Sequence, residues 1–171
     1  MFSIILAGCP TPQGFGIGYQ NTLPWNIPAD MKRFREKTKN GIVIMGRKTW
    51  KSIPAKFRPL KNRLNIVMTK SVPDSFLDGS VYYVNSIQNV ITIVNDRMRD
   101  FDKVWIIGGA QIYNQFLQKY PDHLEEIVLT RIDNHYECDA FVPLDFTGMT
   151  LIEDDPHTYN NINYRFMTYT V

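Results

Sequence analysis

The chain has 171 residues, of which 44% are hydrophobic, so it can bury one substantial core but is too short for two ordinary domains. Two cysteines exclude a disulfide framework, and three scattered histidines do not offer the clustered ligands of a metal site. The net charge is only +2, but thirteen of the lysines and arginines lie within residues 31–73, beside a single acid.

In chain order, apolar and β-branched runs predict strands at residues 2–9, 41–46, 62–69, 80–85, 103–109, 125–132 and 163–171. The first run, FSIILAGC, has no basic lead and is far shorter than a membrane span, which indicates a strand of a cytoplasmic protein rather than a signal peptide. Residues 8–28 form a long irregular connection, of the kind that often carries function. Helical patterns occupy residues 28–39, 47–53, 86–98 and 110–120.

This alternation of strands and helices predicts an α/β fold in one domain over residues 1–171, with a largely parallel sheet covered by helices on both faces. The last two predicted strands follow each other without a helix, which predicts antiparallel pairing at one edge of the sheet. No heptad pattern or exposed apolar strip is evident, so we expect a monomer.

One carboxylate, Asp30, lies on the apolar side of the helix that is predicted to begin at Pro28. The apolar side comprises Ile27, Met31, Phe34 and Thr38. The basic residues that we expect to point to water are Lys32, Arg33, Lys37 and Lys39. An acid near a helix N-terminus is favoured by the free amide groups whatever the protein does. A buried carboxylate needs a polar partner, such as the donor groups of a ligand.

Two glycine patterns fail as nucleotide-binding motifs because of their spacing. GFGIG, Gly14–Gly18, is not GxGxxG, and a Pro-Trp segment rather than a helix follows it, so the Rossmann fingerprint is absent. GIVIMGRKT has one residue too many before Thr49, and its IVIM is a strand rather than a phosphate-binding loop, which argues against an ATPase.

Two strand-to-helix turns remain as candidate anion sites. Gly46 ends a strand, and Arg47 and Lys48 open the next helix, which places amide groups and two cations near a helix N-terminus. Gly108 and Gly109 also join a strand to a helix, where they either allow close approach of the backbone to a ligand or form a tight turn.

The basic segment has several possible uses. It could bind nucleic acid, an anionic membrane or a small polyanion with phosphates and carboxylates, or it could be a solvated surface. For most of its cations we expect the solvated surface. Several of them, however, lie at turns beside strand ends, where open α/β sheets bind ligands.

The ordered motifs of the chain resemble those of the dihydrofolate reductase family. They are GIGYQNTLPW, PADMKRF, VIMGRKTW, SIP, RPLKNRLNIV, WIIGGAQIY and LTRID, and they cover essentially the whole chain. The resemblance implies a central, mostly parallel sheet of eight strands with an antiparallel C-terminal strand, flanked by four helices. It also implies hydride transfer from NADPH to 7,8-dihydrofolate, giving 5,6,7,8-tetrahydrofolate for one-carbon metabolism and thymidylate synthesis. Antifolates such as methotrexate and trimethoprim would be ligands.

On this resemblance, Asp30 accepts hydrogen bonds from the 2-amino group and a ring nitrogen of the pterin and promotes protonation at N5, with the proton arriving through water. Two carboxylate oxygens suit two adjacent donors. Thr130 corresponds to the residue that bridges the acid and the pterin, and Trp25 to the pocket tryptophan. Leu23 belongs to the mobile loop that closes over the nicotinamide and excludes water.

The resemblance assigns further residues to the substrate. Arg63 corresponds to the arginine that pairs with the α-carboxylate of the substrate's glutamate, for which a guanidinium fork is well suited. The walls of the folate pocket are assigned to Ile5, Ala7, Met31, Phe34, Ile53 and Leu60. Without the resemblance, these apolar residues would be interpreted as core.

For the cofactor, the resemblance assigns the nicotinamide site to Ala7, Ile17 and Gly18. It assigns the first phosphate-binding turn to Gly46, Arg47, Lys48 and Thr49, and the second to Ile107, Gly108, Gly109, Ala110, Gln111, Ile112 and Tyr113. It assigns the end of another strand, with the site for the 2′-phosphate, to Met68, Thr69 and Lys70 together with Arg47. In the family a cis peptide joins the paired glycines.

Two positions qualify this assignment. Gln111 stands where many relatives have a basic side chain, so one charge contact to the cofactor is expected to be missing. Asp139 follows Cys138 in the loop that, in some relatives, hydrogen-bonds the mobile active-site loop, and we expect it to do so here.

Two alternatives stay open at this point. One is another pterin- or pyrimidine-reducing enzyme of the same fold, such as the NADPH-dependent reductase of riboflavin synthesis, which lacks the acid at Asp30 with its adjoining Trp25. The other is a non-enzymatic RNA- or DNA-binding domain that uses the basic segment, although the sequence contains no RNP-like motif, recognition-helix pattern or Arg-rich tail.

Overall fold

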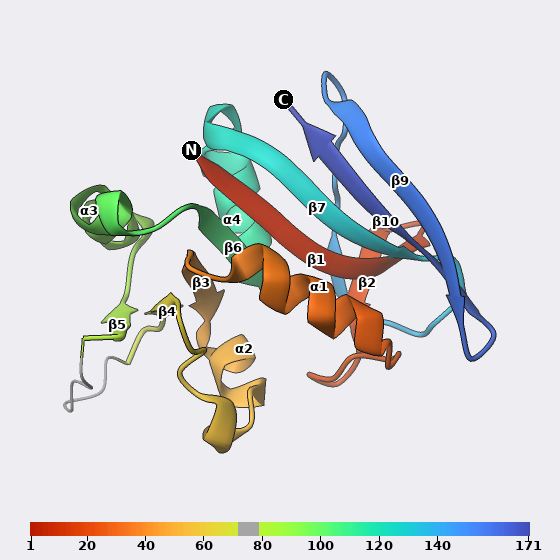
Figure 1. Ribbon diagram of the computed structural model, residues 1–171, viewed down its shortest axis with the longest axis horizontal. Coiled ribbons are helices and arrows are strands. Elements are labelled where there is room, and N and C mark those ends of the chain that lie inside the picture. The colour runs from red at the N-terminus through yellow and green to blue at the C-terminus, as the bar shows by residue number, and fades with distance from the viewer. Residues whose placement is uncertain (72–78) are drawn as a thin grey trace.

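One sheet organises the chain, in the strand order β5-β4-β3-β6-β1-β7-β10-β9 (Figure 1). The structure is a computed structural model that describes residues 1–71 and 79–171, so the last two residues of the basic segment lie outside the described part. The eight strands of this order are β1 (Phe2–Thr11), β3 (Ile42–Gly46), β4 (Leu64–Met68), β5 (Val81–Val84), β6 (Val104–Gly108), β7 (Leu124–Ile132), β9 (Thr150–Tyr159) and β10 (Ile162–Thr170).

The strand directions confirm the predicted mixed sheet. The strands from β5 through β7 pair in parallel, as βα connections require. The C-terminal strand β10 pairs antiparallel with β7 on one side and with β9 on the other. The mostly parallel sheet with an antiparallel C-terminal strand is therefore as predicted, although the edge strand is β9 rather than β10.

Four α-helices lie close to their predicted positions. They are α1 (Pro28–Thr38), α2 (Arg47–Ser52), α3 (Ile87–Arg97) and α4 (Ala110–Lys119). Pro28 occupies the first turn of α1, and the Ser86 side chain caps α3 by accepting a hydrogen bond of 3.1 Å from the Asn89 amide. None of the helices within residues 1–71 and 79–171 is long and apolar enough to cross a membrane.

The period-two alternation of the strands divides the core between the two faces of the sheet. Ile4 and Leu6 of β1 pack in a cluster with residues of α3 and α4, whereas Ile5 packs with Trp50 of α2 and Phe34 of α1. Figure 1 shows α1 in front of the sheet and α4 behind it. The prediction that helices cover both faces is therefore confirmed.

Three strands were not predicted: β2 (Gly14–Gly18), β8 (Ala140–Val142) and β9 (Thr150–Tyr159). Because β2 pairs with β1 and β8 pairs with β2, the described part of the chain forms a sheet of ten strands and not the eight expected. The expectation that residues 8–28 are irregular is wrong for the first half, since β1 continues to Thr11 and β2 folds back on it antiparallel, with Cys9 opposite Gly16. The glycines and prolines of this hairpin interrupt the alternation of apolar and polar residues by which a strand is recognised. β9 is acidic and mostly exposed and contains Pro156, which an edge strand tolerates.

Candidate active site

The glycine turns and Thr69, which were predicted to bind the cofactor, lie where neighbouring parallel strands end. β4, β3, β6 and β1 lie side by side, so their carboxyl ends share one edge of the sheet. The register pairs Met45 of β3 with Gly108 of β6, which places the two glycine turns next to each other. Ligands of open α/β sheets bind at this edge.

Asp30 is held by a residue of β7. The Thr130 hydroxyl donates a hydrogen bond of 2.6 Å to Oδ1 of Asp30, and Thr130 is only 2% exposed. Burial raises the pKa of Asp30, while the Thr130 hydrogen bond and the charge of Arg33 act against that rise. Oδ2 of Asp30 has no hydrogen-bond partner in the described part of the chain. The carboxylate therefore keeps one oxygen for another donor.

The apolar residues predicted for the folate pocket fall in two packed clusters. Ile5 packs with Phe34, Ile53 and Leu60 in one cluster on the side of α1 and α2. Ala7 packs against a second cluster, which contains Trp25. Two predicted site residues are instead largely exposed, namely Met31 at 46% and Leu23 at 51%.

Trp25 combines a packed ring with a free donor. Its ring meets Tyr136 edge to face, with 5.5 Å between the ring centroids. Its Nε1 is buried, yet it has no hydrogen-bond partner among residues 1–71 and 79–171. Since buried N–H groups nearly always donate, this group is a donor that a water molecule or a ligand could use.

Arg63 is positioned by residues that the sequence analysis did not assign to the site. Its Nη1 donates to the Thr38 hydroxyl at 2.9 Å, and its Nε donates to the Lys61 carbonyl at 2.9 Å. Burial lowers the pKa of Arg63, and the nearby charge of Arg35 lowers it further. Two guanidinium groups thus lie close together near the end of α1, which is favourable for an anionic ligand.

Asn65 fixes the segment that carries Leu60 and Arg63. Its side chain accepts a hydrogen bond from the Leu60 amide at 3.0 Å and donates to the carbonyls of Leu60 and Arg63 at 3.0 and 3.1 Å. Asn65 is completely buried in β4. A polar residue within an apolar strand was the sequence signal that could have identified it.

The two glycine turns leave no room for side chains. A Cβ added to Gly46 would lie 3.0 Å from the Ile112 side chain, and one added to Gly108 would lie 3.2 Å from the Tyr113 ring. Gly108 also has a φ of +115°, which favours glycine, and the peptide between Gly108 and Gly109 is cis, as expected. These glycines let α4 pack tightly against the ends of β3 and β6.

Polar side chains accompany these turns. Arg47 and Lys48 are exposed at the start of α2, and the Thr49 hydroxyl would lie 3.6 Å from a Cβ on Gly109. Thus the beginnings of α2 and α4 adjoin. Gln111 is exposed, Ala110 is half-buried, and neither contradicts the predicted placement.

A third turn follows β4, where the Thr69 amide donates to the Val84 carbonyl at 2.7 Å. The Thr69 hydroxyl accepts a hydrogen bond of 3.2 Å from the Ser71 amide, and Lys70 is exposed beside it. This turn lies next to that of β3, because β4 and β3 are neighbours in the sheet.

Several residues predicted for the cofactor pack in the interior beside the turns. Met68, Ile112 and Tyr113 belong to the core cluster, and Ile107 packs against another cluster. The Tyr113 hydroxyl donates to the Ile5 carbonyl at 2.7 Å, and burial raises the pKa of this tyrosine. The hydroxyl thereby ties α4 to β1.

The loop around Ile17 and Gly18 is tied to Asp139. The Asp139 amide donates to the Gly18 carbonyl at 2.9 Å, and the Gln20 amide donates to the Asp139 carboxylate at 2.9 Å. The expected hydrogen bonding between Asp139 and this loop is therefore confirmed.

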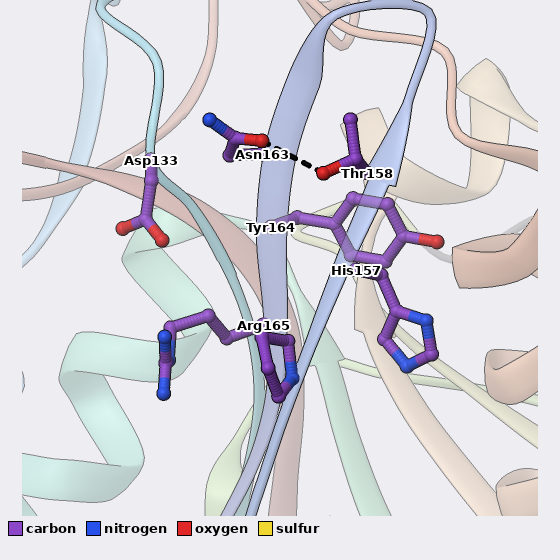
Figure 2. Close-up of a pocket in the computed structure, with 7 residues that line it drawn as sticks. Asp133, His157, Thr158, Asn163, Tyr164 and Arg165 are labelled. Carbon is purple, nitrogen blue, oxygen red and sulfur yellow. Dashed lines mark hydrogen bonds between the residues drawn. The ribbon is translucent and has the colours of Figure 1, made fainter.

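A separate hollow of about 450 Å³ lies at the β9–β10 hairpin (Figure 2). It is lined by Asp133, Pro156, His157, Thr158, Asn163, Tyr164 and Arg165. Figure 2 shows Asp133 and Arg165 on one side of β10 and the rings of Tyr164 and His157 on the other. Because its lining includes none of the predicted site residues, we place the candidate site at the strand ends and not in this hollow.

The described residues also contain no group of three or more His, Cys, Asp or Glu that could hold a metal ion.

The family model for dihydrofolate reductase matches residues 1–171 of the chain. The chain belongs to the dihydrofolate reductase family. It is 34% identical to dihydrofolate reductase of Candida albicans over 174 residues, covering 85% of this chain and 88% of that protein. It is 31% identical to dihydrofolate reductase of Aedes albopictus over 183 residues, covering 98% and 96%.

Relatives with a longer chain also match. The bifunctional dihydrofolate reductase-thymidylate synthase of Glycine max is 38% identical over 169 residues, which are 92% of this chain but 32% of that protein. The chain thus spans about a third of the length of that bifunctional relative. The match favours dihydrofolate reductase over both alternatives that the sequence left open, and the dihydrofolate reductase family uses NADPH.

Proposed function

We propose that this chain reduces 7,8-dihydrofolate to 5,6,7,8-tetrahydrofolate with NADPH. The observation that carries the proposal is the contact between Thr130 and Asp30, which holds a carboxylate whose pKa is raised by burial. One carboxylate oxygen is engaged by Thr130, and the other is left for a donor group of the substrate. Family membership indicates the reaction, and we expect both ligands to bind between Asp30 and the strand ends that carry the glycine turns.

At the pterin, Asp30 would accept the hydrogen bonds of the 2-amino group and the ring nitrogen, and Thr130 would keep the carboxylate in position. The charge of Asp30 then favours protonation at N5, with the proton arriving through water. The walls of this pocket would be Ile5, Ala7, Met31, Phe34, Ile53 and Leu60. The buried Nε1 of Trp25 is a further donor that the pocket offers.

At the other end of the substrate, Arg63 would pair with the α-carboxylate of the glutamate. Its hydrogen bonds to Thr38 and to the Lys61 carbonyl fix the guanidinium before the ligand binds. Pre-organised donors lose less entropy when they bind. The charge of Arg35 beside it strengthens the attraction for an anion.

NADPH, when bound, supplies the hydride. The exposed cations Arg47, Lys48 and Lys70 fit a phosphorylated dinucleotide, because they lie at neighbouring strand ends around the glycine turns. Discrimination for the 2′-phosphate would rest on Arg47, Thr69 and Lys70. The residues proposed to line the turns are Gly46, Thr49, Met68, Ile107, Gly108, Gly109, Ala110, Gln111, Ile112 and Tyr113.

The segment with Ile17, Gly18 and Leu23 would cover the nicotinamide end and exclude water. Asp139 holds one part of this segment, whereas Leu23 is half exposed and free to pack on a ligand. We further propose that residues 1–171 form one domain that acts as a monomer and binds methotrexate and trimethoprim. A cytoplasmic location stays a prediction from the sequence.

The first experiment is a spectrophotometric assay of the purified protein with dihydrofolate and NADPH, run beside NADH and beside a methotrexate-inhibited control. We expect rapid oxidation of NADPH that methotrexate abolishes, with NADH oxidised more slowly. Tight binding of NADPH without oxidation would reject dihydrofolate as the substrate and direct the search to another pterin or a pyrimidine.

A further inference from the structure

The sequence analysis expected Arg33 to point to water. In the structure its side chain lies against the sheet instead. Its side chain is only 11% exposed, whereas that of the neighbouring Lys32 is 70% exposed. Arg33 follows Asp30 by three residues on α1, and residues at this spacing share one side of a helix. A buried cation therefore lies one helical turn from the proposed catalytic acid.

Residues of the last two strands hold the guanidinium of Arg33 in one orientation. Its Nη1 and Nη2 donate to the two carboxylate oxygens of Glu153 on β9 at 2.8 and 2.7 Å. Nη2 also donates to the hydroxyl of Thr168 at 3.2 Å, and that hydroxyl donates to Glu153. The central carbon of the guanidinium lies 4.5 Å from the centre of the Phe166 ring. The bidentate hydrogen bond to Glu153 and the cation–π contact with Phe166 together fix the plane and the position of the Arg33 guanidinium.

The same strands also position the partner of Asp30. Phe166 of β10 lies directly opposite Thr130 of β7 in the sheet, and Thr130 donates to Asp30. The cation and the carboxylate are thus attached to one framework through Phe166 and Thr130. The distance between their charges is set by the sheet as well as by the helix.

We propose that Arg33 is a positioning residue that presents a fixed positive charge to Asp30 and keeps this acid ionised, and that Glu153 both holds Arg33 and moderates its effect. The inference rests on the proposed function, because it assigns a role to Arg33 only through Asp30. It requires no contact between Arg33 and either ligand.

The electrostatics agree with this geometry. Burial raises the pKa of Asp30, and Arg33 is a cation whose charge lowers it. The hydrogen bonds from Arg33, opposed by burial and aided by Thr168, lower the pKa of Glu153 to about 2. Glu153 therefore stays ionised at any pH at which the enzyme would work, so the ion pair persists while Asp30 titrates.

Groups from other elements also face Asp30. Tyr113 on α4 and Tyr164 on β10 interact with its charge, and burial, together with that charge, raises the pKa of both phenols. They are neutral near neutral pH. The His157 ring on β9 stacks on the Tyr164 ring, with 5.4 Å between the ring centroids, and its centroid lies 5.0 Å from that of Phe166. Figure 2 shows His157 and Tyr164 on the same side of β10. His157 also contacts Asp155 at 2.7 Å, on the side of the hairpin that is exposed to solvent.

The test measures the ionisation of Asp30 directly, without substrate. Carboxyl carbons of ¹³C-labelled aspartate are titrated by NMR, and Asp30→Asn assigns the signal of Asp30. We expect Arg33→Met to move the midpoint to higher pH and Glu153→Gln to move it to lower pH, because the second change leaves the charge of Arg33 unopposed. Arg33→Lys keeps a positive charge and should stay close to the parent. Lys32→Met is the matched control, since it removes an exposed cation from the same helix.

If Arg33→Met and Glu153→Gln displace the titration midpoint of Asp30 in opposite directions, the role of Arg33 is electrostatic. Loosened packing would move both midpoints in the same direction. Displacements of the same sign, or a displacement by Arg33→Met no larger than that by Lys32→Met, would overturn the proposal. If Arg33→Met fails to fold, as a thermal melt would reveal, Arg33→Lys and Glu153→Gln still decide the matter. As the titration needs no turnover, it gives its answer even if dihydrofolate is not the substrate. In an active enzyme, the pH midpoint of kcat/KM should move in the same direction as the NMR midpoint in each variant.

Discussion

Replacement of Thr130 by valine tests the contact on which the proposed function depends. The two side chains have nearly the same shape, and Thr130 is 2% exposed, so the change removes a hydroxyl without opening a cavity. What is lost is a hydrogen bond of 2.6 Å to a carboxylate. A bond of this kind contributes about 1.5–3 kcal/mol. Because Asp30 is partly open to solvent and water can replace the hydroxyl in part, we expect a loss of stability near the lower end, about 1.5 kcal/mol at neutral pH.

The loss should depend on pH in a defined direction. The Thr130 hydrogen bond lowers the pKa of Asp30, so it stabilises the ionised form. Its contribution is therefore present above the pKa of Asp30 in the folded protein and fades as the pH falls through that value. Urea unfolding of Thr130→Val and the parent should differ more at pH 8 than at pH 4.

Activity provides the second readout for the same variant. If Thr130 holds the acid in place for the pterin, kcat/KM for dihydrofolate should fall by roughly tenfold, the equivalent of about 1.4 kcal/mol. Thr130→Ser keeps the hydroxyl and serves as the control, with activity closer to the parent. Parent-like activity in Thr130→Val, or a loss in Thr130→Ser as large as that in Thr130→Val, would show that activity does not depend specifically on the hydrogen bond, and the reasoning would be refuted.

Three further changes test separate parts of the site, and a fourth tests the packing of the β1–β2 hairpin. Asp30→Asn should lose most activity near neutral pH and regain some in acid, where the pterin protonates beforehand; undiminished neutral activity would remove Asp30 from the mechanism. The same variant should unfold at higher urea concentration than the parent at neutral pH. Burial raises the pKa of Asp30 in the folded protein, so the stability of the parent falls as the pH rises from the unfolded-state pKa to the folded-state pKa of Asp30. Asparagine cannot ionise and avoids this loss. Arg63→Leu should raise KM for dihydrofolate and spare NADPH binding, and a defect confined to NADPH would contradict the assignment. Lys70→Gln should raise KM for NADPH but not for NADH, whereas an equal rise for both would exclude Lys70 from recognition of the 2′-phosphate. Gly16→Ala should cost about 1–3 kcal/mol in urea unfolding, because its Cβ would lie 2.5 Å from Sγ of Cys138; Cys138→Gly should restore part of this loss.

The sequence predicted the elements whose pattern is local. The runs IVIM and LNIV are apolar except for Asn65, because parallel strands are covered on both faces. Their neighbours are helices with recognisable starts at Pro28 and after Gly46. The hairpin β1–β2 and the edge strand β9 were missed for the opposite reason. Their residues include glycine, proline and adjacent acids, and their strand conformation depends on partners elsewhere in the chain.

Side-chain partners were harder to predict than elements. Asp30 and Thr130 are separated by 100 residues, and it was the family resemblance, not the spacing, that paired them. The residues that position Arg63 could be recognised only by their polarity in apolar surroundings, as with the buried Asn65. A helical projection placed Arg33 on the solvent side, because it could not include an acid that is 120 residues away.

That acid, Glu153, changes what the edge of the sheet contributes to the chemistry. β9 is mostly exposed and looks dispensable, yet its Glu153 anchors the helix that carries Asp30. Burial alone would leave Asp30 neutral over a wider range of pH, and a neutral carboxyl group accepts hydrogen bonds from the pterin less well than a carboxylate does. Burial raises the pKa of Asp30, and a hydroxyl from β7 and a cation whose position depends on β9 and β10 oppose that rise. The ionisation of the proposed catalytic acid therefore depends on contacts across the assembled sheet. We expect changes in the β9–β10 hairpin to affect the pH dependence of activity more than the stability of the fold.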